Sequence, residues 1–598
     1  MKPRKTLLFM LAWIVIPALY LEAADYFEKP NVVLIITDDQ GYGDLACHGN
    51  EIVQTPNMGK LYEESVRLTD FHVAPTCAPT RAGLMSGAHK NRAGAWHTIG
   101  GCNILRERFI SMPEVFDRNG YATGMYGKWH LGDAYPYLPH NRGFDEAIYH
   151  GGGGVGQTPD YWTNDYFDDT YFRNGVPEKF EGYCTDVFFR EATKFIEKHQ
   201  NEPFFVYIST NAPHSPFMVE EKYYNLYKDH EGLSDRERVF FGMITNIDDN
   251  MGKLEKKLEE LGLRENTIFI FMTDNGTATG HKVFNAGMRG HKGSQYDGGH
   301  RVPFFIHWEN GAIEGGRDVE PVTTHADILP TLIDICNLTP VDGPRYDGVS
   351  LKPLLTDKAK SWPERTLVID NNRLQHPEKW RMSSVMTDEW RLVDGKELYH
   401  IDKDPGQEDD IAADHPGIVE RLRAEYESWW DYVSTDFSKY EAYEIGVPGH
   451  EKVTLTCHEL HTLGSVTWNQ SQIRQPVKVI NSKFDKGYYM IDVYESGTYA
   501  ISLRRWPRES GYAFNEAPEQ LGEDKPWYES MPEGMVLNIE KASLEVGGLL
   551  LEKPVDMSAE EVTFKAKLSA GRQQLSTYFS TDEGEGINAF YVYIEPLD

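Results

Sequence analysis

The sequence has few cysteines: six in 598 residues, and no two of them form a CxxC pair. Structural zinc sites and dense disulfide frameworks both need closely spaced cysteines, so the sequence indicates neither. One or two disulfides remain open, because sequence alone cannot assign the pairing. The cysteines are Cys47, Cys77, Cys102, Cys184, Cys336 and Cys457.

Basic residues are scarce relative to acidic ones. Lysine and arginine number 60 against 92 aspartates and glutamates, which gives a formal net charge of −32. So acidic a surface favours solubility and argues against nucleic-acid binding. It does not exclude an anionic substrate, but the basic groups that hold such a substrate must then be concentrated in one pocket.

Long apolar runs are absent except near the first residue. Three basic residues precede an apolar run at positions 6–21, and the small residues of EAAD follow it. This order predicts a signal peptide over residues 1–24, cleaved near Ala23 or Ala24, and a secreted or periplasmic protein with no membrane span after cleavage. A single membrane anchor is the alternative, which Pro17 and the small residues disfavour.

Short apolar runs alternate with helix patterns over residues 25–360. This alternation predicts an α/β domain with a mostly parallel sheet sandwiched by helices. A capping box at Ser234 and Glu237 predicts the start of a long helix that ends near Leu261. Buried strands are expected at 31–37, 203–210, 267–273 and 302–308.

The rest of the chain has two further characters. Residues 361–445 combine short strands with one helix and predict a smaller α+β subdomain. Residues 446–598 contain alternating β patterns separated by glycine-bearing turns, which predict an antiparallel β module.

Two acidic pairs each follow a predicted buried strand. Asp38 and Asp39 come directly after the first strand, and Asp274 with Asn275 follow another. Open α/β folds place their sites at the carboxyl edge of the sheet, and carboxylate and amide oxygens suit Ca²⁺ or Mg²⁺. Either pair alone could be ordinary turn chemistry, but turn chemistry explains the two together less well.

The segment PTCAPTRAGLMSG carries a cysteine at a predicted helix start. Pro79 is typical of a first helical turn, so the helix dipole and Arg81 should lower the pKa of the Cys77 thiol. A plain cysteine nucleophile is one interpretation. A reactive thiolate in an oxidising compartment would, however, be exposed to oxidation.

The order C-x-P-[ST]-R resembles the signal at which type I sulfatases, of the alkaline phosphatase superfamily, convert a cysteine to formylglycine. The motifs TDDQGYGDL, GKWHLGD, APHSPF, TDNGT, GHKGSQYDGGHRVP and HADILPTLIDI follow in the order typical of that family, over roughly residues 30–440. Thr80 stands where serine is commoner, which leaves the cysteine, proline and arginine intact. The whole is similar to bacterial secreted arylsulfatases and polysaccharide sulfatases with an added C-terminal β module.

The resemblance implies a site. One Ca²⁺ per chain would be bound by Asp38, Asp39, Asp274, Asn275 and the formylglycine at Cys77, which a formylglycine-generating enzyme would produce. Arg81 would hold the ionised diol, Lys128 and His130 would anchor and orient it, and Lys292 with His214 would hold the sulfate on its leaving-group side, with His214 as general acid. Taken singly, each basic residue could instead be a surface lysine or a satisfied core histidine.

The resemblance also implies a mechanism. One hydroxyl of the hydrated aldehyde attacks sulfur, and loss of a proton from the other then expels sulfate and restores the aldehyde. A serine in the same place would be sulfated, and the reaction could stop at this sulfated intermediate.

Three segments could shape the substrate pocket: residues 95–108, 149–169 and 370–382. The second joins glycines to aromatic and acidic residues, which suits sugar binding but also suits a packed surface loop. Candidate substrate contacts are His97, Arg106, His150, Arg373 and His376. A further pair, His458 and His461, could reach the pocket or bind metal, although isolated surface histidines are the simpler interpretation.

These features predict a secreted, calcium-dependent sulfuric ester hydrolase that acts on sulfated carbohydrates. One alternative is a phosphodiesterase or phosphonate hydrolase of the same superfamily. The other is a non-catalytic binder of sulfated glycans, which would result if Cys77 were not converted.

Overall fold

The computed structural model describes residues 29–359, 361–581 and 586–597. The predicted signal peptide at residues 1–24 lies outside these ranges and stays a prediction. Within them, no helix is long and apolar enough to span a membrane. All six cysteines are described, and none is paired in a disulfide.

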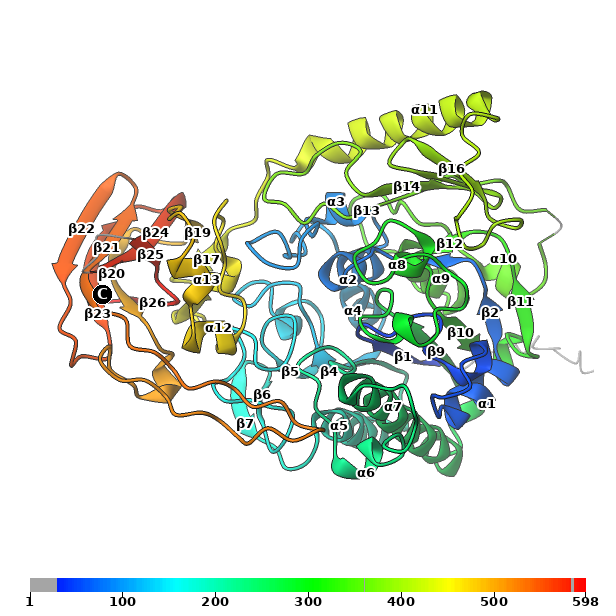
Figure 1. Cartoon of the computed structure of the whole chain (residues 1–598), viewed down its shortest axis with the longest axis horizontal. Helices are drawn as coiled ribbons and strands as arrows, with labels where there is room; N and C mark the ends of the chain where they lie inside the picture. Colours follow the sequence, from blue (N-terminus) through cyan, green and yellow to red (C-terminus); the bar gives the residue numbers. More distant parts are fainter. Residues whose placement is uncertain (1–28, 360, 582–585, 598) are drawn as a thin grey trace, which may run out of the picture.

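A ten-stranded mixed sheet forms the centre of the larger domain (Figure 1). Its five middle strands, from β9 to β5, are parallel, while β10, β6 and β7 run antiparallel to their neighbours. The order is β11 (Arg317–Val319), β2 (Val66–Leu68), β10 (Phe304–His307), β9 (Thr267–Thr273), β1 (Asn31–Thr37), β8 (Phe204–Ser209), β4 (Ala122–Lys128), β5 (Glu146–His150), β6 (Thr170–Arg173) and β7 (Val176–Lys179).

Helices cover both faces of this sheet, because successive residues of its buried strands point to opposite sides. Val32, Leu34 and Ile36 of β1 pack with one set of helices, while Val33 and Ile35 pack with the other. The first set is α2 (Cys77–Ser86), α4 (Met112–Arg118) and α9 (Ile328–Ile335); the second is α1 (Pro56–Glu64), α5 (Cys184–Lys198) and α7 (Asp235–Glu260).

The predicted α/β architecture is confirmed in its main features. The Ser234 hydroxyl accepts the Glu237 N–H at 3.4 Å, and the Glu237 carboxylate accepts the Ser234 N–H at 2.7 Å, so the capping box starts α7 as expected. The strand expected at 302–308 forms, but it is antiparallel to β9. Shorter elements are α3 (Lys90–Ala93), α6 (Glu221–Tyr224), α8 (Asp297–His300), α10 (Lys352–Leu355), β3 (Phe71–His72) and β12 (Thr323–Thr324).

A four-stranded antiparallel sheet follows, packed against helix α11 (Pro416–Val433). Buried Arg391 ties this sheet to the larger domain: its guanidinium lies 2.7 Å from Asp70 Oδ1 and 3.2 Å from Asp297 Oδ1. The strands are β13 (Leu367–Asp370), β14 (Ser383–Met386), β15 (Trp390–Val393) and β16 (Glu397–His400).

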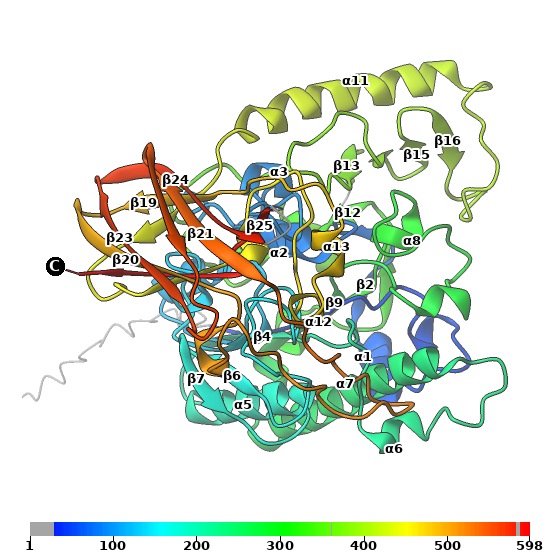
Figure 2. The same ribbon diagram turned by 60° about the vertical axis from the view of Figure 1, so that its left-hand side comes forward.

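The last part of the chain is a β module of two sheets, antiparallel except where β17 pairs with β19 (Figures 1 and 2). Its core includes Tyr137 and Trp162 of the larger domain, so the two parts are packed together. One sheet holds β17 (Tyr443–Ile445), β19 (Tyr489–Val493), β24 (Gly571–Thr581), β25 (Gly586–Asn588), β21 (Ile539–Val546) and β22 (Leu549–Pro554); the other holds β18 (Val453–Thr456), β26 (Tyr591–Pro596), β20 (Gly497–Arg504) and β23 (Val562–Leu568). Two short helices, α12 (Gln470–Arg474) and α13 (Val477–Ile480), join β18 to β19.

Candidate active site

Two neighbouring parallel strands bring the acidic residues together. Strands β1 and β9 pair in register at their last residues, so Asp38 and Asp39 emerge beside Asp274 and Asn275. All four side chains are buried. The Asp39 N–H donates to Asp274 Oδ1 at 3.2 Å, and Asn275 Nδ2 donates to Asp39 Oδ1 at 2.9 Å. The carboxyl edge of the sheet therefore carries a compact set of oxygen atoms, as the sequence predicted.

This set fits a hard divalent cation. Asp38 Oδ1 and Asn275 Oδ1 are buried and have no hydrogen-bond partner among the residues that the structure describes. Asp38, Asp274 and Cys77 each offer one possible metal-binding atom, and these three atoms lie within 4.8 Å of one another. Unpartnered buried oxygens are costly, and a cation would satisfy them. Carboxylate and amide oxygens are the ligands of Ca²⁺ and Mg²⁺.

Cys77 is the first residue of α2, and every side chain of that helix is buried. The expectation of an acidified thiol is wrong. Burial raises the pKa of Cys77, and Asp38 raises it further, although Lys128 and Lys292 oppose this. A neutral thiol is a weak nucleophile, so an unmodified Cys77 is poorly suited to attack.

The guanidinium of Arg81 forms an ion pair with Asp274, in addition to the expected position near the Cys77 thiol. Its Nη2 lies 2.8 Å from Asp274 Oδ2, and its Nη1 donates to the Lys128 carbonyl at 3.2 Å and also to Ser209 Oγ. Burial alone would lower the pKa of Arg81, but Asp274 and its other neighbours raise it above the ordinary value. The Arg81 guanidinium is therefore a fixed positive charge in contact with Asp274 of the acidic cluster.

Two lysines each pair with one aspartate. Lys128 ends β4, and its Nζ lies 2.6 Å from Asp38 Oδ2. Lys292 Nζ lies 2.7 Å from Asp39 Oδ2, and this contact holds the pKa of Asp39 well below its usual range despite burial. The pairs place two ammonium groups beside Cys77, where an anion would meet them.

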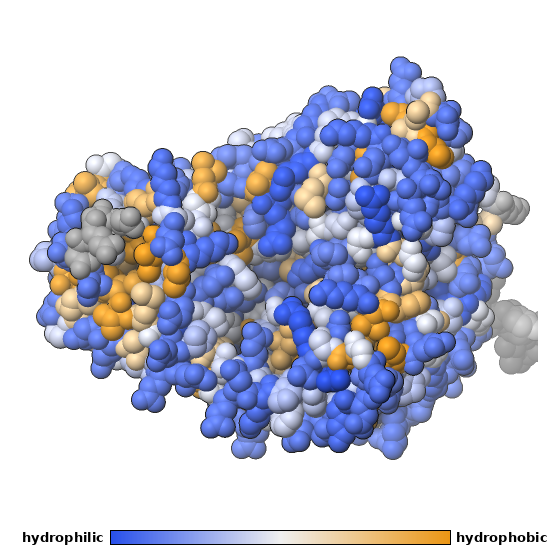
Figure 3. Space-filling model, viewed as in Figure 1, coloured by the Kyte–Doolittle hydropathy of each residue, from blue (hydrophilic) through white to orange (hydrophobic). Residues whose placement is uncertain are grey.

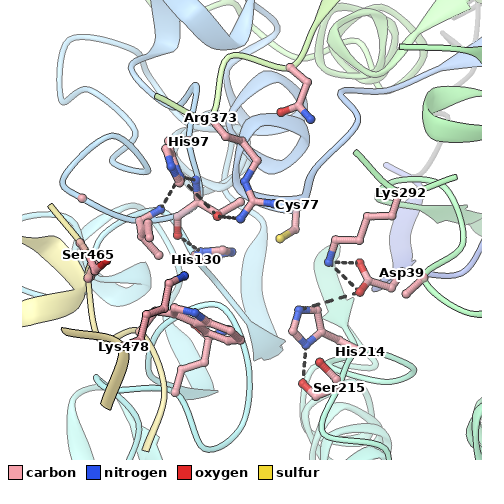
Figure 4. Close-up of a pocket in the computed structure, with 18 of the residues that line it drawn as sticks. Asp39, Cys77, His97, His130, His214, Ser215, Lys292, Arg373, Ser465 and Lys478 are labelled. Atoms are coloured by element: carbon pink, nitrogen blue, oxygen red, sulfur yellow. Dashed lines mark hydrogen bonds and ion pairs between the residues drawn. The ribbon is translucent and has the colours of Figure 1, made fainter. Parts of the chain in front are cut away.

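Two histidines complete the group. His130 Nε2 donates to the Thr98 carbonyl at 2.8 Å, which leaves its Nδ1 buried and without a partner. His214 Nδ1 donates to the Ser215 carbonyl at 2.5 Å, so its Nε2 faces the cavity, 3.8 Å from Asp39 Oδ2 (Figure 4). Burial and the Lys292 charge lower the pKa of His214 to about 3.

A glycine explains how the backbone packs against His130. His130 has a φ of 59°, in the left-handed region. A Cβ at Gly153 would lie 2.3 Å from the His130 ring, so only glycine fits there. At least one glycine of the run at 151–154 therefore serves to position a histidine and not to bind substrate.

A cavity of about 700 Å³ opens onto Cys77 and Lys292. Figure 3, in the same view as Figure 1, shows a hollow between the β module and the larger domain. All three segments that the sequence singled out contribute to its walls. His97 and Arg373 are among the residues that line it, as expected.

Three other candidates do not line it. Arg106 donates to the backbone carbonyls of Arg92 and Asp436, at 2.7 and 2.6 Å, so its role is structural. His150 is buried in register with Lys128 on the neighbouring strand, and His376 Nδ1 lies 3.2 Å from the hydroxyl of Tyr440.

The interpretation of His458 and His461 as surface residues is wrong. Both are buried, His458 beside Glu459 and His461 beside Gln375. Sequence reasoning also missed several residues of the cavity wall: Gln157, Arg236, Arg381, Ser465, Trp468 and Lys478. The segments at 149–169 and 370–382, which contain Gln157 and Arg381, gave a signal through their composition, whereas Arg236 and Lys478 gave none.

Comparison with known proteins gives a consistent result. The sulfatase family model matches residues 30–338. Arylsulfatase J of Mus musculus is 27% identical over 458 residues, which cover 66% of this chain and 74% of that protein. N-acetylgalactosamine-6-sulfatase of Canis lupus familiaris is 29% identical over 381 residues, which cover 57% and 69%.

Solved structures give the same fold. The crystal structure of Ps i-CgsB in complex with k-i-k-neocarrahexaose has a TM-score of 0.62 and 26% identity, and the match covers 67% of this chain and 93% of that one. A phosphonate monoester hydrolase of Agrobacterium radiobacter has a TM-score of 0.50 at 20% identity, covering 66% and 96%, and shares the fold alone.

Proposed function

Because the chain belongs to the sulfatase family and is a sulfuric ester hydrolase, we propose that it removes sulfate from sulfated carbohydrates, using one bound Ca²⁺ and a formylglycine made from Cys77. The observation that carries this proposal is the position of Cys77 at a helix start, beside Lys292 and the buried oxygens of Asp38 and Asn275.

Four side chains would hold the Ca²⁺: Asp38, Asp39, Asp274 and Asn275. Two of their oxygens have no partner within the protein, which supports a role as ligands. When bound, a divalent cation polarises sulfate oxygens and favours the ionised form of a nearby hydroxyl. Arg81 fixes one of the four by its contact with Asp274 and would keep the set in place.

Conversion of Cys77 to formylglycine would replace a neutral thiol by an aldehyde, whose hydrate supplies a hydroxyl nucleophile. The unpartnered Nδ1 of His130 is available to accept the proton of the second hydroxyl. Lys128 stabilises negative charge in the same place. These residues would therefore orient the nucleophile and later assist sulfate release.

His214 and Lys292 lie on the open side of Asp39, toward the cavity (Figure 4). The ammonium group of Lys292 suits the sulfate, and the imidazole of His214 suits the oxygen of the leaving group. The low pKa of His214 describes the site without an anion. A bound sulfate ester would bring negative charge next to the imidazole and raise its pKa, as a general acid requires.

The substrate class follows from charge. The chain has a net charge of −32, yet the cavity is lined by several basic side chains, while Asp39 is its only acidic one among the described residues. Such a pocket attracts anions, whereas the rest of the acidic surface repels them. Secretion, which the apolar run at 6–21 predicts, would bring the enzyme to extracellular sulfated glycans.

The alternative function, hydrolysis of phosphonate or phosphate esters, is supported only by similarity of fold. We would express the chain with and without a formylglycine-generating enzyme and compare turnover of 4-nitrophenyl sulfate and 4-nitrophenyl phosphate. The proposal expects sulfate turnover that depends on the maturation enzyme. Faster phosphate turnover would favour the rival, and protein whose Cys77 stays unconverted, with no turnover of either ester, would favour a glycan binder.

A further inference from the structure

One wall of the cavity comes from the β module (residues 446–598). The loop after Thr462 contributes Ser465 and Trp468, and helix α13 contributes Lys478 (Figure 4). The family model ends at residue 338, so this wall lies outside the matched region. The cavity is therefore shaped in part by a segment that the family match does not account for.

The wall is fixed to the catalytic domain by hydrogen bonds. The Thr158 hydroxyl donates to the Thr467 carbonyl at 2.8 Å, and the Thr158 N–H donates to the Trp468 carbonyl at 3.1 Å. Gln470 Nε2 donates to the carbonyl of Tyr161 at 3.0 Å. On the other side, the Gly100 N–H donates to the His458 carbonyl at 2.7 Å. The module is thus docked against two loops that also line the cavity.

Four cations on the cavity wall have no acidic partner. Among the described residues, no carboxylate forms an ion pair with any of them, although ion pairs are numerous elsewhere. The Nε of Arg381 is buried and has no hydrogen-bond partner in residues 29–359, 361–581 and 586–597. Within the described part of the chain, Asp39 is the only carboxylate that lines the cavity, and it is already paired with Lys292. The four are Arg236, Arg373, Arg381 and Lys478.

This arrangement is unusual for so acidic a chain. Acidic residues outnumber basic ones by 92 to 60, so a cation has many possible partners. Unpaired cations gathered in one cavity repel each other, and a ligand anion would remove that repulsion. The reacting sulfate is already provided for by Lys128, Lys292 and His214. The additional cations therefore point to a second negative group on the ligand.

We propose that Arg373 and Lys478, together with Arg381 and Arg236 of the same cavity wall, form a second anion site, which binds another sulfate or carboxylate of the same glycan. This proposal rests on the proposed function for the identity of the first group. Arg373 Nη2 contacts Thr98 Oγ1 at 3.2 Å, which holds its guanidinium near His97 and His130. Trp468, which also lines the cavity, would offer an aromatic face to the sugar that links the two anions.

The test compares ligands that differ by one charge. Binding is measured by calorimetry in a Cys77→Ala background, so that no ligand is consumed and turnover is not needed. The probes are neocarrabiose with one sulfate, neocarrabiose with two sulfates, and a monosulfated disaccharide that carries a carboxylate. The variants are Lys478→Ala and Arg373→Ala. The control is Lys565→Ala, an exposed lysine of β23 in the same module.

We expect the disulfated disaccharide to bind about tenfold more tightly than the monosulfated one, because a charge-assisted hydrogen bond adds affinity of this order. Each cavity variant should reduce this preference to about threefold or less, while the control keeps it. Equal affinity for both disaccharides in the parent, or a preference that neither variant changes, would overturn the proposal.

The carboxylate probe identifies the second group. Affinity equal to that of the disulfated probe supports a site open to any anion, and affinity equal to that of the monosulfated probe supports a site selective for sulfate. The calorimetric test of the second anion site and the turnover test of the proposed function can fail independently of each other. If the converted enzyme hydrolyses no sulfate ester, the proposed function falls, whereas the calorimetric preference still decides whether the second anion site exists.

Discussion

The Nζ of Lys128 lies 2.6 Å from Oδ2 of Asp38, and neither side chain is exposed to solvent. The other carboxylate oxygen of Asp38 has no hydrogen-bond partner in the described part of the chain. One oxygen thus balances a buried charge while the other stays available, which is what a residue shared between a lysine and a metal ion requires.

Loss of metal should abolish turnover. Chelation is expected to stop hydrolysis of 4-nitrophenyl sulfate, and added Ca²⁺ should restore it, because four oxygen-bearing side chains form the site. Asn275→Ala should lower bound calcium from about one ion per chain to a small fraction, measured by elemental analysis. The exposed Asp402→Asn serves as control. Full metal content in Asn275→Ala would contradict the assignment.

Active protein should carry an aldehyde at position 77. Peptide mass mapping should find formylglycine there and an unmodified thiol at Cys457, which is also buried but lies outside the motif. Cys77→Ser should fold but lose nearly all turnover, since a sulfated serine lacks the second hydroxyl that releases sulfate. Full activity in protein that contains only unmodified Cys77 would refute this prediction.

His214→Ala should harm the two substrate types unequally. A sugar alkoxide is a poor leaving group and needs a proton, whereas nitrophenolate leaves without one. General acids contribute about 10²–10⁴-fold, so kcat for a sugar sulfate should fall by far more than kcat for 4-nitrophenyl sulfate. Equal losses in kcat would make His214 a binding residue and Lys292 the next candidate for the acid.

A pH-dependent contribution to stability is expected from Glu459. Burial alone would raise its pKa, but hydrogen bonds from His458 and Asn103 lower it to about 2 in the folded protein, against an ordinary value of 4.5. Its ionised form therefore stabilises the fold above about pH 4.5, and this stabilisation is lost as the pH falls toward 2.

The measurement is the unfolding temperature of Glu459→Gln between pH 2 and pH 7. Glu459→Gln should unfold at a lower temperature than the wild type at pH 6, and the difference should shrink as the pH falls. Glu529→Gln, at an exposed position, provides the control. A difference that stays constant with pH would show that the Glu459 charge is not responsible.

The acidic cluster was predictable because its geometry follows from local order. A buried strand with an acid directly after it places that acid at a sheet edge, and this holds for both Asp38 and Asp274. What the sequence could not show is that β1 and β9 are neighbours in register. Strand adjacency depends on packing between distant segments, which no local pattern encodes.

The wall formed by the β module was not predictable for a related reason. Trp468 and Lys478 lie in loops and short helices, with no periodicity that points to a partner. Their position depends on contacts such as that between Thr158 and Thr467, which are far apart in the chain. Likewise, the burial of His458 follows from docking of the module and not from the residues beside it.

The distance along the chain between Cys77 and this wall affects the timing of synthesis. Residue 462 follows Cys77 by about 385 residues. At ordinary elongation rates of about 5–20 residues per second, the cysteine is made roughly 20 to 80 seconds before the last wall of its cavity. A maturation enzyme that acts on the growing chain therefore meets an open motif, and the finished protein encloses a residue whose chemistry has already been decided.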